Sequence, residues 1–406
     1  MSNNWYKDNP TLAMLKKEEK FPGKYFPQPV VFGLGQGSAT FANAYNNQSA
    51  PSVAEFMITR VADFAVASID GQLLAAASSD PGSFIDGAEL MIDSAFQTEV
   101  NRIASAIFRN GAGTIGEIEL VAPAGPPNTY TITLANSDDS VQFEKGMVLV
   151  SAQFVDGSGL QPVDVGTITE VDRNAGTLTL SSLTNLVVQW PAGYFLAQQG
   201  DLPNAVNNNF AVPGATTNSY LKISGFAAWL PLAGPPPGDS FFTVNRNLDR
   251  QRLAGVTFDG STLSLEEALL QGTGRIALNG GRVDTGICSY ATYTALITSL
   301  GAKVQYIDEK IGEIGFRGVQ VNGANTVMSV FPDRNCPDGL IYALEMDSWC
   351  LRSQNPAPHI LKYMDEIEIL RNQDQDSAQL RVGFYGNLYT SRPGSNGVIK
   401  VQLQEF

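Results

Sequence analysis

The chain has 406 residues, enough for two or three domains of ordinary size. Hydrophobic residues make up 43% of it and charged residues only 16%, which predicts a globular protein with a largely uncharged surface. Such a surface suits a protein whose faces are later covered by neighbours, because burying an amide costs less than burying a charge; a polar β-rich surface explains it equally well. The net charge of −14 argues against tight nucleic-acid binding, which depends mainly on Lys and Arg.

The three cysteines are Cys288, Cys336 and Cys350, and their spacing predicts neither a disulfide framework nor a zinc site. Folding in a reducing cytoplasm fits this usage. The first twenty residues are charged and contain no apolar run of signal-peptide length. No later segment approaches the roughly 18 apolar residues of a membrane-spanning helix, so we expect neither secretion by a signal peptide nor a membrane span.

Residues 1–25 predict an N-terminal arm, with five Lys against three acidic residues and one short amphipathic stretch. Residues 26–72 predict a long two-stranded hairpin, with a turn-rich tip at Asn46–Ser52 and a returning run, EFMITRVADFAVAS. A hairpin of this kind is marginally stable alone in water. We therefore expect the arm and the hairpin to bury little within their own subunit.

The strongest predicted helix covers Phe84–Asn110, within a segment that we assign to residues 73–116. Ser83 and Asp86 have the spacing of a capping box at its start. Apolar residues recur at steps of three and four and form one stripe: Ile92, Phe96, Val100, Ile103 and Ile107.

Residues 117–205 contain short alternating runs separated by turn clusters, which predict a small inserted β-barrel. This segment holds ten acidic residues against Lys145 and Arg173, a net charge of −8. We expect so acidic a module to face solvent, where like charges keep assembled particles apart.

Beyond a return segment, 206–244, residues 245–375 predict an α/β domain, and 376–406 predict strands that return to the first half. One helix is expected near Leu263–Asn279, opened by Ser264 with Glu267. A second helix is expected after Ser289 as its cap and before Gly301 as its stop. The second helix has an apolar stripe: Tyr293, Leu296, Ile297 and Leu300.

Two glycine patterns match dinucleotide-binding fingerprints on paper. The first is Gly111, Gly113 and Gly116, and the second is Gly272, Gly274 and Ala277. A true fingerprint follows a strand and opens a helix, whereas the first pattern follows a helix and the second lies within one. We interpret them as a helix end and a helix break.

Other chemical motifs are also rejected. Asn372, Asp374 and Asp376 resemble the start of a calcium-binding loop, but the required Gly and bidentate Glu are absent, so a solvated loop is the better interpretation. His359 is the only histidine, so a catalytic cysteine such as Cys336 would need it as its base. We interpret Cys336 instead as an ordinary cysteine in a loop. We predict no catalytic, cofactor-binding or metal-binding residue, no cofactor, and no enzymatic activity.

The order of these segments resembles the major capsid proteins of tailed bacteriophages, which have the Hong Kong 97 fold. Short phrases spread over the chain outside the barrel also resemble capsid sequences of one phage group: DNPTLAMLKKEEKFPGKYFPQPV (8–30), SATFANA (38–44), FMITRVADFAVASIDG (56–71), FRNGAGTIG (108–116), RQRLAGV (250–256), FPDRNCPDG (331–339) and RVGFYGNLY (381–389).

The resemblance implies an α+β capsid fold in which the hairpin is the E-loop, the long helix is the spine of the P-domain and the α/β part is the A-domain. It further implies hexamers and pentamers of one chain that form an icosahedral head around double-stranded DNA. The implied partners are a scaffolding protein and a portal protein, with a decoration protein as an optional addition. The DNA is contacted only weakly, and no membrane is involved. The implied location is the virion, after assembly in the cytoplasm of the bacterial host.

One departure from the family concerns covalent crosslinking. The founding member joins its subunits through a lysine of the E-loop, but residues 26–69 contain no Lys and only Arg60 as a basic residue. We therefore expect no crosslink of that type.

Two alternative functions stay open: the shell of an encapsulin-like nanocompartment with enzyme cargo, and a multidomain surface protein whose acidic β module binds glycans.

Overall fold

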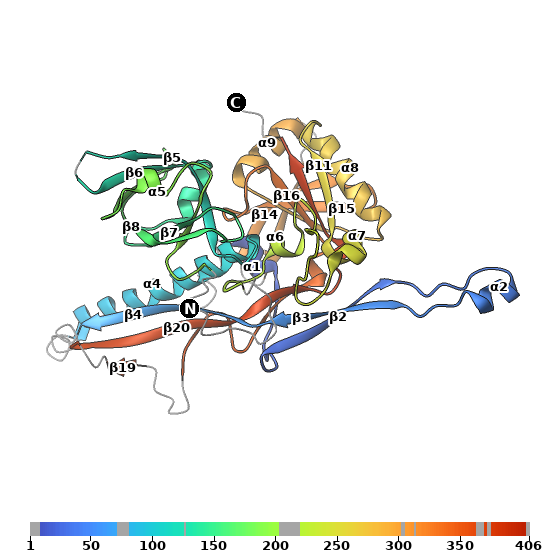
Figure 1. Ribbon diagram of the computed structural model, residues 1–406, viewed down its shortest axis with the longest axis horizontal. Helices are drawn as coiled ribbons and strands as arrows, with labels where there is room; N and C mark the ends of the chain where they lie inside the picture. Colours follow the sequence, from blue (N-terminus) through green and yellow to red (C-terminus); the bar gives the residue numbers. More distant parts are fainter. Residues whose placement is uncertain are drawn as a thin grey trace.

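The computed structural model describes residues 9–70, 81–125, 127–202, 220–301, 305–311, 314–362, 369–371 and 375–402. It divides into a projecting hairpin, a long sheet beneath a long helix, a closed β-barrel, and a seven-stranded sheet with helices (Figure 1). The hairpin extends to one side of the body, and the long helix and its sheet extend to the other. The result is an α+β protein with a small barrel, as predicted.

The N-terminal segment is packed on the body, which corrects the expectation of an arm that buries little. Helix α1 (Pro10–Met14) leads into β1 (Lys16–Glu18), which pairs in parallel with β17 (Trp349–Ser353). Leu12, Leu15 and Phe21 are buried in the main hydrophobic core. Apolar side chains at these three positions supply the burial that holds the segment in place. Residues 1–8 lie outside the described part of the chain.

Polar contacts fix the start of this segment. The Thr11 hydroxyl donates to Oδ2 of buried Asp333 over 2.6 Å, and the Thr11 backbone N–H donates to the same oxygen over 3.2 Å. Asn335 Nδ2 donates to Oδ1 of Asn9 over 2.9 Å. The loop around Asp333, which also contains Cys336, therefore anchors the N-terminal segment.

The hairpin consists of β2 (Tyr25–Gly33) and β3 (Ser52–Thr59), which pair antiparallel and form a two-stranded sheet of their own. Two details differ from the prediction. The tip carries a short helix, α2 (Phe41–Asn46), ahead of the expected turn. The returning run is also two strands: after Arg60 the chain continues as β4 (Val61–Asp70), which pairs with β20 (Ser377–Thr390) in the long sheet.

The long helix α4 (Pro81–Phe108) lies along β4 and β20 (Figure 1). The predicted stripe is confirmed, since Phe96, Val100, Ile103 and Ile107 are buried and Ile92 packs against the Phe96 cluster. The helix begins two residues before the expected cap at Ser83, whose side chain, like that of Asp86, lies outside the described residues. The long sheet also contains β1, β17, β18 (His359–Ile360) and β19 (Ile369–Arg371).

The predicted barrel is present and closed, in the strand order β10-β5-β6-β9-β8-β7. Its chain enters after α4 through Gly111 and Gly113, both at φ +90°, which confirms the first glycine pattern as a helix end. A Cβ at Gly113 would lie 2.6 Å from the Asp201 carbonyl oxygen, so a side chain there would push the entry and exit strands apart. The elements are β5 (Thr114–Pro123), β6 (Thr129–Leu134), η1 (Ser137–Gln142), β7 (Val148–Ala152), β8 (Leu160–Asp172), β9 (Thr177–Ser181), α5 (Leu186–Gln189) and β10 (Phe195–Gln198).

The seven-stranded mixed sheet has the order β11-β21-β16-β12-β15-β14-β13 and is covered by helices α8 and α9. The strands are β11 (Val256–Gly260), β12 (Thr285–Cys288), β13 (Gln305–Ile311), β14 (Ile314–Asn322), β15 (Val327–Pro332), β16 (Leu340–Leu344) and β21 (Gly397–Val401). Shorter elements precede it or connect it with the long sheet: α6 (Phe226–Trp229), η2 (Arg246–Leu248) and α7 (Arg250–Ala254) precede it, and η4 (Met346–Ser348) and η5 (Pro393–Ser395) connect it with the long sheet.

The predicted caps of the two helices are confirmed. Ser264 accepts a hydrogen bond from the Glu267 N–H at the start of α8 (Leu265–Leu278), and Ser289 accepts one from the Thr292 N–H at the start of α9 (Tyr290–Leu300). Gly301, at φ +52°, follows the last residue of α9.

The expected helix break at the second glycine pattern is wrong, because α8 continues through Gly272 and Gly274. A Cβ at Gly272 would lie 2.5 Å from Cδ1 of Ile399 in β21. Gly272 therefore lets the helix approach the sheet closely, and the packing gained outweighs the low helix propensity of glycine.

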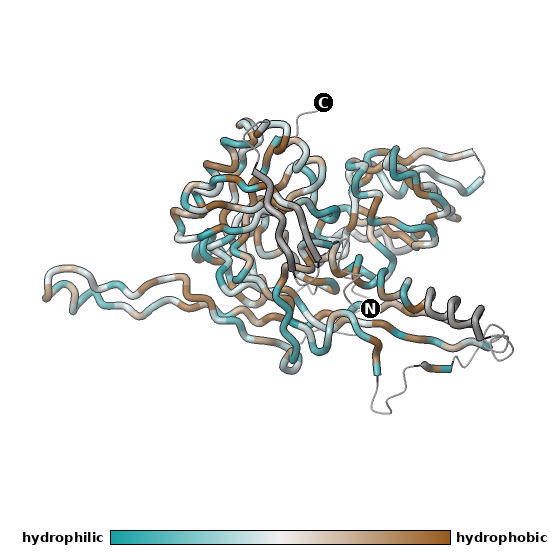
Figure 2. Tube along the Cα trace, turned by 180° about the vertical axis from the view of Figure 1, so that it is seen from behind, coloured by the Kyte–Doolittle hydropathy of each residue, from teal (hydrophilic) through white to brown (hydrophobic). Residues whose placement is uncertain are grey.

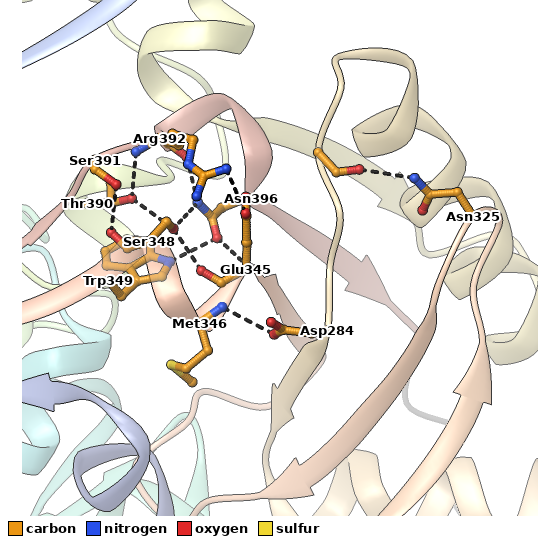
Figure 3. A network of polar contacts seen from close by, with 11 residues as sticks. Asp284, Asn325, Glu345, Met346, Ser348, Trp349, Thr390, Ser391, Arg392 and Asn396 are labelled. Atoms are coloured by element: carbon orange, nitrogen blue, oxygen red, sulfur yellow. Dashed lines mark hydrogen bonds and ion pairs between the residues drawn. The ribbon is translucent and has the colours of Figure 1, made fainter.

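A polar cluster around buried Asn396 joins the long sheet to the seven-stranded sheet (Figure 3). The chain crosses from one sheet to the other twice here, through η4 and through η5. Asn396 Oδ1 accepts from the Glu345 backbone N–H over 2.8 Å and from Trp349 Nε1 over 2.9 Å. Its Nδ2 donates to Ser348 Oγ over 3.1 Å and to the Arg392 carbonyl over 2.7 Å. One amide thus ties together both crossing segments.

Candidate assembly surface

The outer half of the hairpin has the properties of a surface made for contact with another molecule. Residues 31–53 contain no Asp, Glu, Lys, Arg or His, and none of their side chains is buried. At the root, by contrast, Val30, Ala54, Phe56 and Ile58 are buried in the main core. The hairpin is therefore anchored at one end and reaches away from the body at the other (Figure 2).

Large apolar side chains on this outer half are exposed to solvent. The exposed fraction is 91% for Phe41, 76% for Leu34 and 70% for Tyr45, and Val31 and Val53 are also exposed. A group of such side chains on a projecting element, without charges between them, is typical of an interaction site. Burying them against a partner would require no charge to be desolvated.

Hydrogen bonds within the tip give it a defined shape. The Ser49 backbone N–H donates to the Gln36 carbonyl over 2.9 Å, and the Gln36 N–H donates to Ser49 Oγ over 3.0 Å. Helix α2 is closed by the Asn47 N–H, which donates to the Asn43 carbonyl. A tip organised in this way loses less conformational entropy on binding than a loose loop would.

A second exposed apolar patch lies on β4. Asp63, Ala65 and Ala67 of this strand face α4, so the alternate residues point to the opposite face of the sheet. Phe64 and Val66 on that face are exposed, and the Phe64 ring meets the Tyr385 ring of β20 at a centroid distance of 5.6 Å. Arg381 of β20 lies opposite Val66 in the register, so this face of the long sheet combines exposed apolar side chains with a charged one.

The structure does not bring Cys336 and His359 together. Cys336 is buried in the main core, where its thiol donates to the Ile287 carbonyl, and burial raises its pKa well above the ordinary value. His359 lies in β18, beside Asn355 and the Pro356 carbonyl. The Cys336 thiol therefore stays neutral and has no imidazole next to it, which leaves the pair without the geometry of a nucleophile and base.

The other motifs give no site within the described residues. Of the supposed calcium-binding loop, Asn372 and Asp374 lie outside the described part of the chain. Cys288, Cys336 and Cys350 are free thiols. Over the described ranges, no group of three or more His, Cys, Asp or Glu side chains is arranged to hold a metal ion, and no helix is long and apolar enough to cross a membrane.

Four charged side chains form a ring between α4, β4 and the end of the barrel, and no sequence pattern predicted this ring. Asp63 of β4 contacts Arg102 of α4 at 3.4 Å and Lys222 at 2.8 Å. Asp201, just after the barrel, contacts Arg102 at 2.6 Å and Lys222 at 3.0 Å. The four residues are far apart in sequence, and no spacing pattern connects them. Together they join the barrel to the long helix and its sheet.

Comparison with known proteins identifies this architecture. No protein-family model and no curated protein sequence matches the chain. Among solved structures, the capsid asymmetric unit of cyanophage A-1(L) aligns with a TM-score of 0.53 and 11% identity, over 100% of this chain and 95% of that chain. The chain has the fold of a tailed-phage capsid protein.

Further structures are similar at lower scores. The capsid of a native GTA particle aligns with a TM-score of 0.45 and 9% identity, over 97% of this chain and 90% of that one. The holo-SrpI encapsulin complex of Synechococcus elongatus PCC 7942 aligns with a TM-score of 0.43 and 10% identity, over 98% and 90%. At 11% identity the alignment with the cyanophage capsid establishes the capsid fold and no more.

Proposed function

We propose that this protein is the major structural subunit of a phage head, and that it acts by self-assembly and not by catalysis. The observation that carries the proposal is the projecting hairpin on a subunit of the capsid fold: its outer half, residues 31–53, is uncharged and exposes Phe41 and Tyr45. Copies of one chain would form hexamers and pentamers, and these would close into an icosahedral shell around double-stranded DNA. A closed shell covers every such surface with a neighbour, which no isolated subunit can do.

In this assignment each part of the chain has a role in the shell. The hairpin of β2 and β3 is the E-loop, which is the outer part of the segment 26–72 expected from the sequence, and 73–116 with 206–244 form the P-domain around α4, with β4 in its sheet. Residues 245–375 form the A-domain, which gathers around the hexamer and pentamer axes. The C-terminal strands, 376–406, return to the junction of the two domains, and the acidic barrel, 117–205, faces solvent.

The apolar face of β4 is our candidate seat for the hairpin of a neighbouring copy. Phe64 and Val66 offer exposed apolar groups beside Arg381, and residues 31–53 of the hairpin offer apolar groups without charges. Scaffolding and portal proteins are the further partners that we propose for assembly in the host cytoplasm, with a decoration protein as an additional one in the virion. DNA would be held weakly, since the net charge of the chain is −14.

Sedimentation of the expressed chain tests the proposed function. We expect the protein, alone or with its scaffolding protein, to sediment as large closed particles. A chain that remains monomeric at every concentration, with and without scaffold, would refute a shell-forming role. Nuclease-protected DNA in purified virions supports a phage head, whereas particles that enclose enzymes and no DNA would instead support a nanocompartment.

Covalent crosslinking gives a second expected outcome. Because residues 26–69 contain no Lys, particles boiled in detergent should run as a single band at the monomer mass of 43.5 kDa. Non-covalent contacts or a decoration protein would then reinforce the shell. A ladder of bands above the monomer would show this expectation to be wrong.

A further inference from the structure

A buried carboxyl group without a partner lies beside the charged ring at the root of the barrel. Glu99 of α4 has no exposed surface, and neither of its carboxyl oxygens has a hydrogen-bond partner among the residues that the structure describes. The charged groups that act on it come from each element around it: Asp63 of β4, Arg102 of α4, and Asp201 and Lys222 next to the barrel.

The charges of the ring are already balanced without Glu99. Two carboxylates, Asp63 and Asp201, each contact both cations, Arg102 and Lys222. An ionised Glu99 would add a third negative charge to a buried site that holds only two positive ones. A protonated Glu99 leaves the ring neutral, and it avoids placing an unpaired charge in the interior.

We propose that this cluster is a proton-sensitive joint between the barrel and the long helix, closed while Glu99 is protonated and loosened when Glu99 loses its proton. The joint would control how firmly the barrel is held on α4 and β4. This inference concerns the single subunit and does not depend on what a shell would enclose.

The pH range follows from the two states of Glu99. Burial, reinforced by the charge of Asp63, raises the pKa of Glu99 to about 8 in the closed joint. In an open joint the solvated carboxyl returns to its ordinary pKa near 4.5. The closed state therefore binds the proton of Glu99 more tightly than the open state does. The stabilisation of the closed state by this proton is complete below about pH 4.5, declines as the pH rises, and is lost above about pH 8. Between these limits the open fraction should rise about tenfold for each pH unit.

Hydrogen exchange of the full-length subunit between pH 5 and 9 tests this, with Glu99→Gln as the matched variant. Glutamine imitates the protonated side chain and does not titrate. The ratio of wild-type to variant exchange rates cancels the intrinsic effect of pH on exchange. For peptides covering residues 95–103 and 198–202, this ratio should rise about tenfold per pH unit from about 5 to 8 and then level off. A ratio that stays constant over this range overturns the proposal.

A second variant keeps the test decisive if Glu99→Gln does not fold. Asp201→Asn removes one negative charge that opposes the ionisation of Glu99. Glu99 should then lose its proton at a lower pH. Exchange at residues 95–103, divided by the intrinsic exchange rate at each pH, should level off below the pH at which the wild-type chain does. An unchanged pH for this plateau would show that Glu99 does not titrate within the joint.

Discussion

Replacing Phe41 and Tyr45 together with serine should abolish shell assembly and leave the subunit folded. Both rings project from α2 into solvent and make no contact with the main core, so the subunit loses nothing by their removal. In a shell, each ring would be buried against a neighbour, at about 1.5 to 3 kcal/mol per ring and at every copy. Sedimentation should therefore show only small species for the double variant, with an unfolding curve like that of the wild-type subunit.

Leu183→Ser is the matched control for this experiment. The exposed fraction of Leu183 is 93%, close to the 91% of Phe41, but Leu183 lies on the barrel and not on the hairpin. The control should assemble as the wild-type chain does. Normal particles from the Phe41 and Tyr45 double variant would mean that the hairpin tip is not an assembly contact.

Asn396→Ala should produce the largest loss of stability from one polar side chain. The change leaves buried Trp349 Nε1, the partly buried Glu345 N–H and the Arg392 carbonyl without their partner, and it removes one of the hydrogen bonds of Ser348 Oγ. Each buried group left unsatisfied costs about 1 to 3 kcal/mol, so the free energy of unfolding should fall by at least about 3 kcal/mol. The cluster lies where the chain crosses between the sheets, so both sheets should lose order together (Figure 3).

Denaturant unfolding measures this effect, in subunits that also carry Phe41→Ser and Tyr45→Ser so that assembly does not add to stability. Asn325→Ala is the control, since Asn325 is exposed and donates one hydrogen bond, to the Gly281 carbonyl. Its cost should be about 1 kcal/mol or less. Equal losses for the two variants would contradict the role given to Asn396.

Local patterns in the sequence predicted the elements that are stabilised locally. The stripe of α4 and the caps at Ser264 and Ser289 could be identified because helix periodicity and capping depend on residues within a few positions of each other. The barrel could be recognised from alternation and turns, since three of its six strand pairs join consecutive strands: β5–β6, β7–β8 and β8–β9.

Features that depend on distant partners could not be predicted. At Arg60 the returning run changes partner, from β2 to β20, and its buried positions shift from Ala54, Phe56 and Ile58 to Val61, Ala67 and Ile69. The reason for the division is β20, which lies far later in the chain. Gly272 was misinterpreted because its reason for being in a helix is Ile399, more than a hundred residues later in the chain. The N-terminal segment was expected to lie free because nothing near Thr11 in sequence indicates Asp333 as its partner.

The candidate site was predictable only in outline. The hairpin was expected, but the helix at its tip and the exposure of Phe41 and Tyr45 required the structure. The charged ring and Glu99 gave no sequence signal, because their members come from four separate segments of the chain.

Electron cryo-microscopy of assembled particles tests the central claim most directly, because it locates residues 31–53 in the shell. Our account predicts density for this segment on the surface of an adjacent copy, with Phe41 and Tyr45 buried there. Particles in which the segment folds back on its own subunit, or stays exposed to solvent between copies, would contradict it.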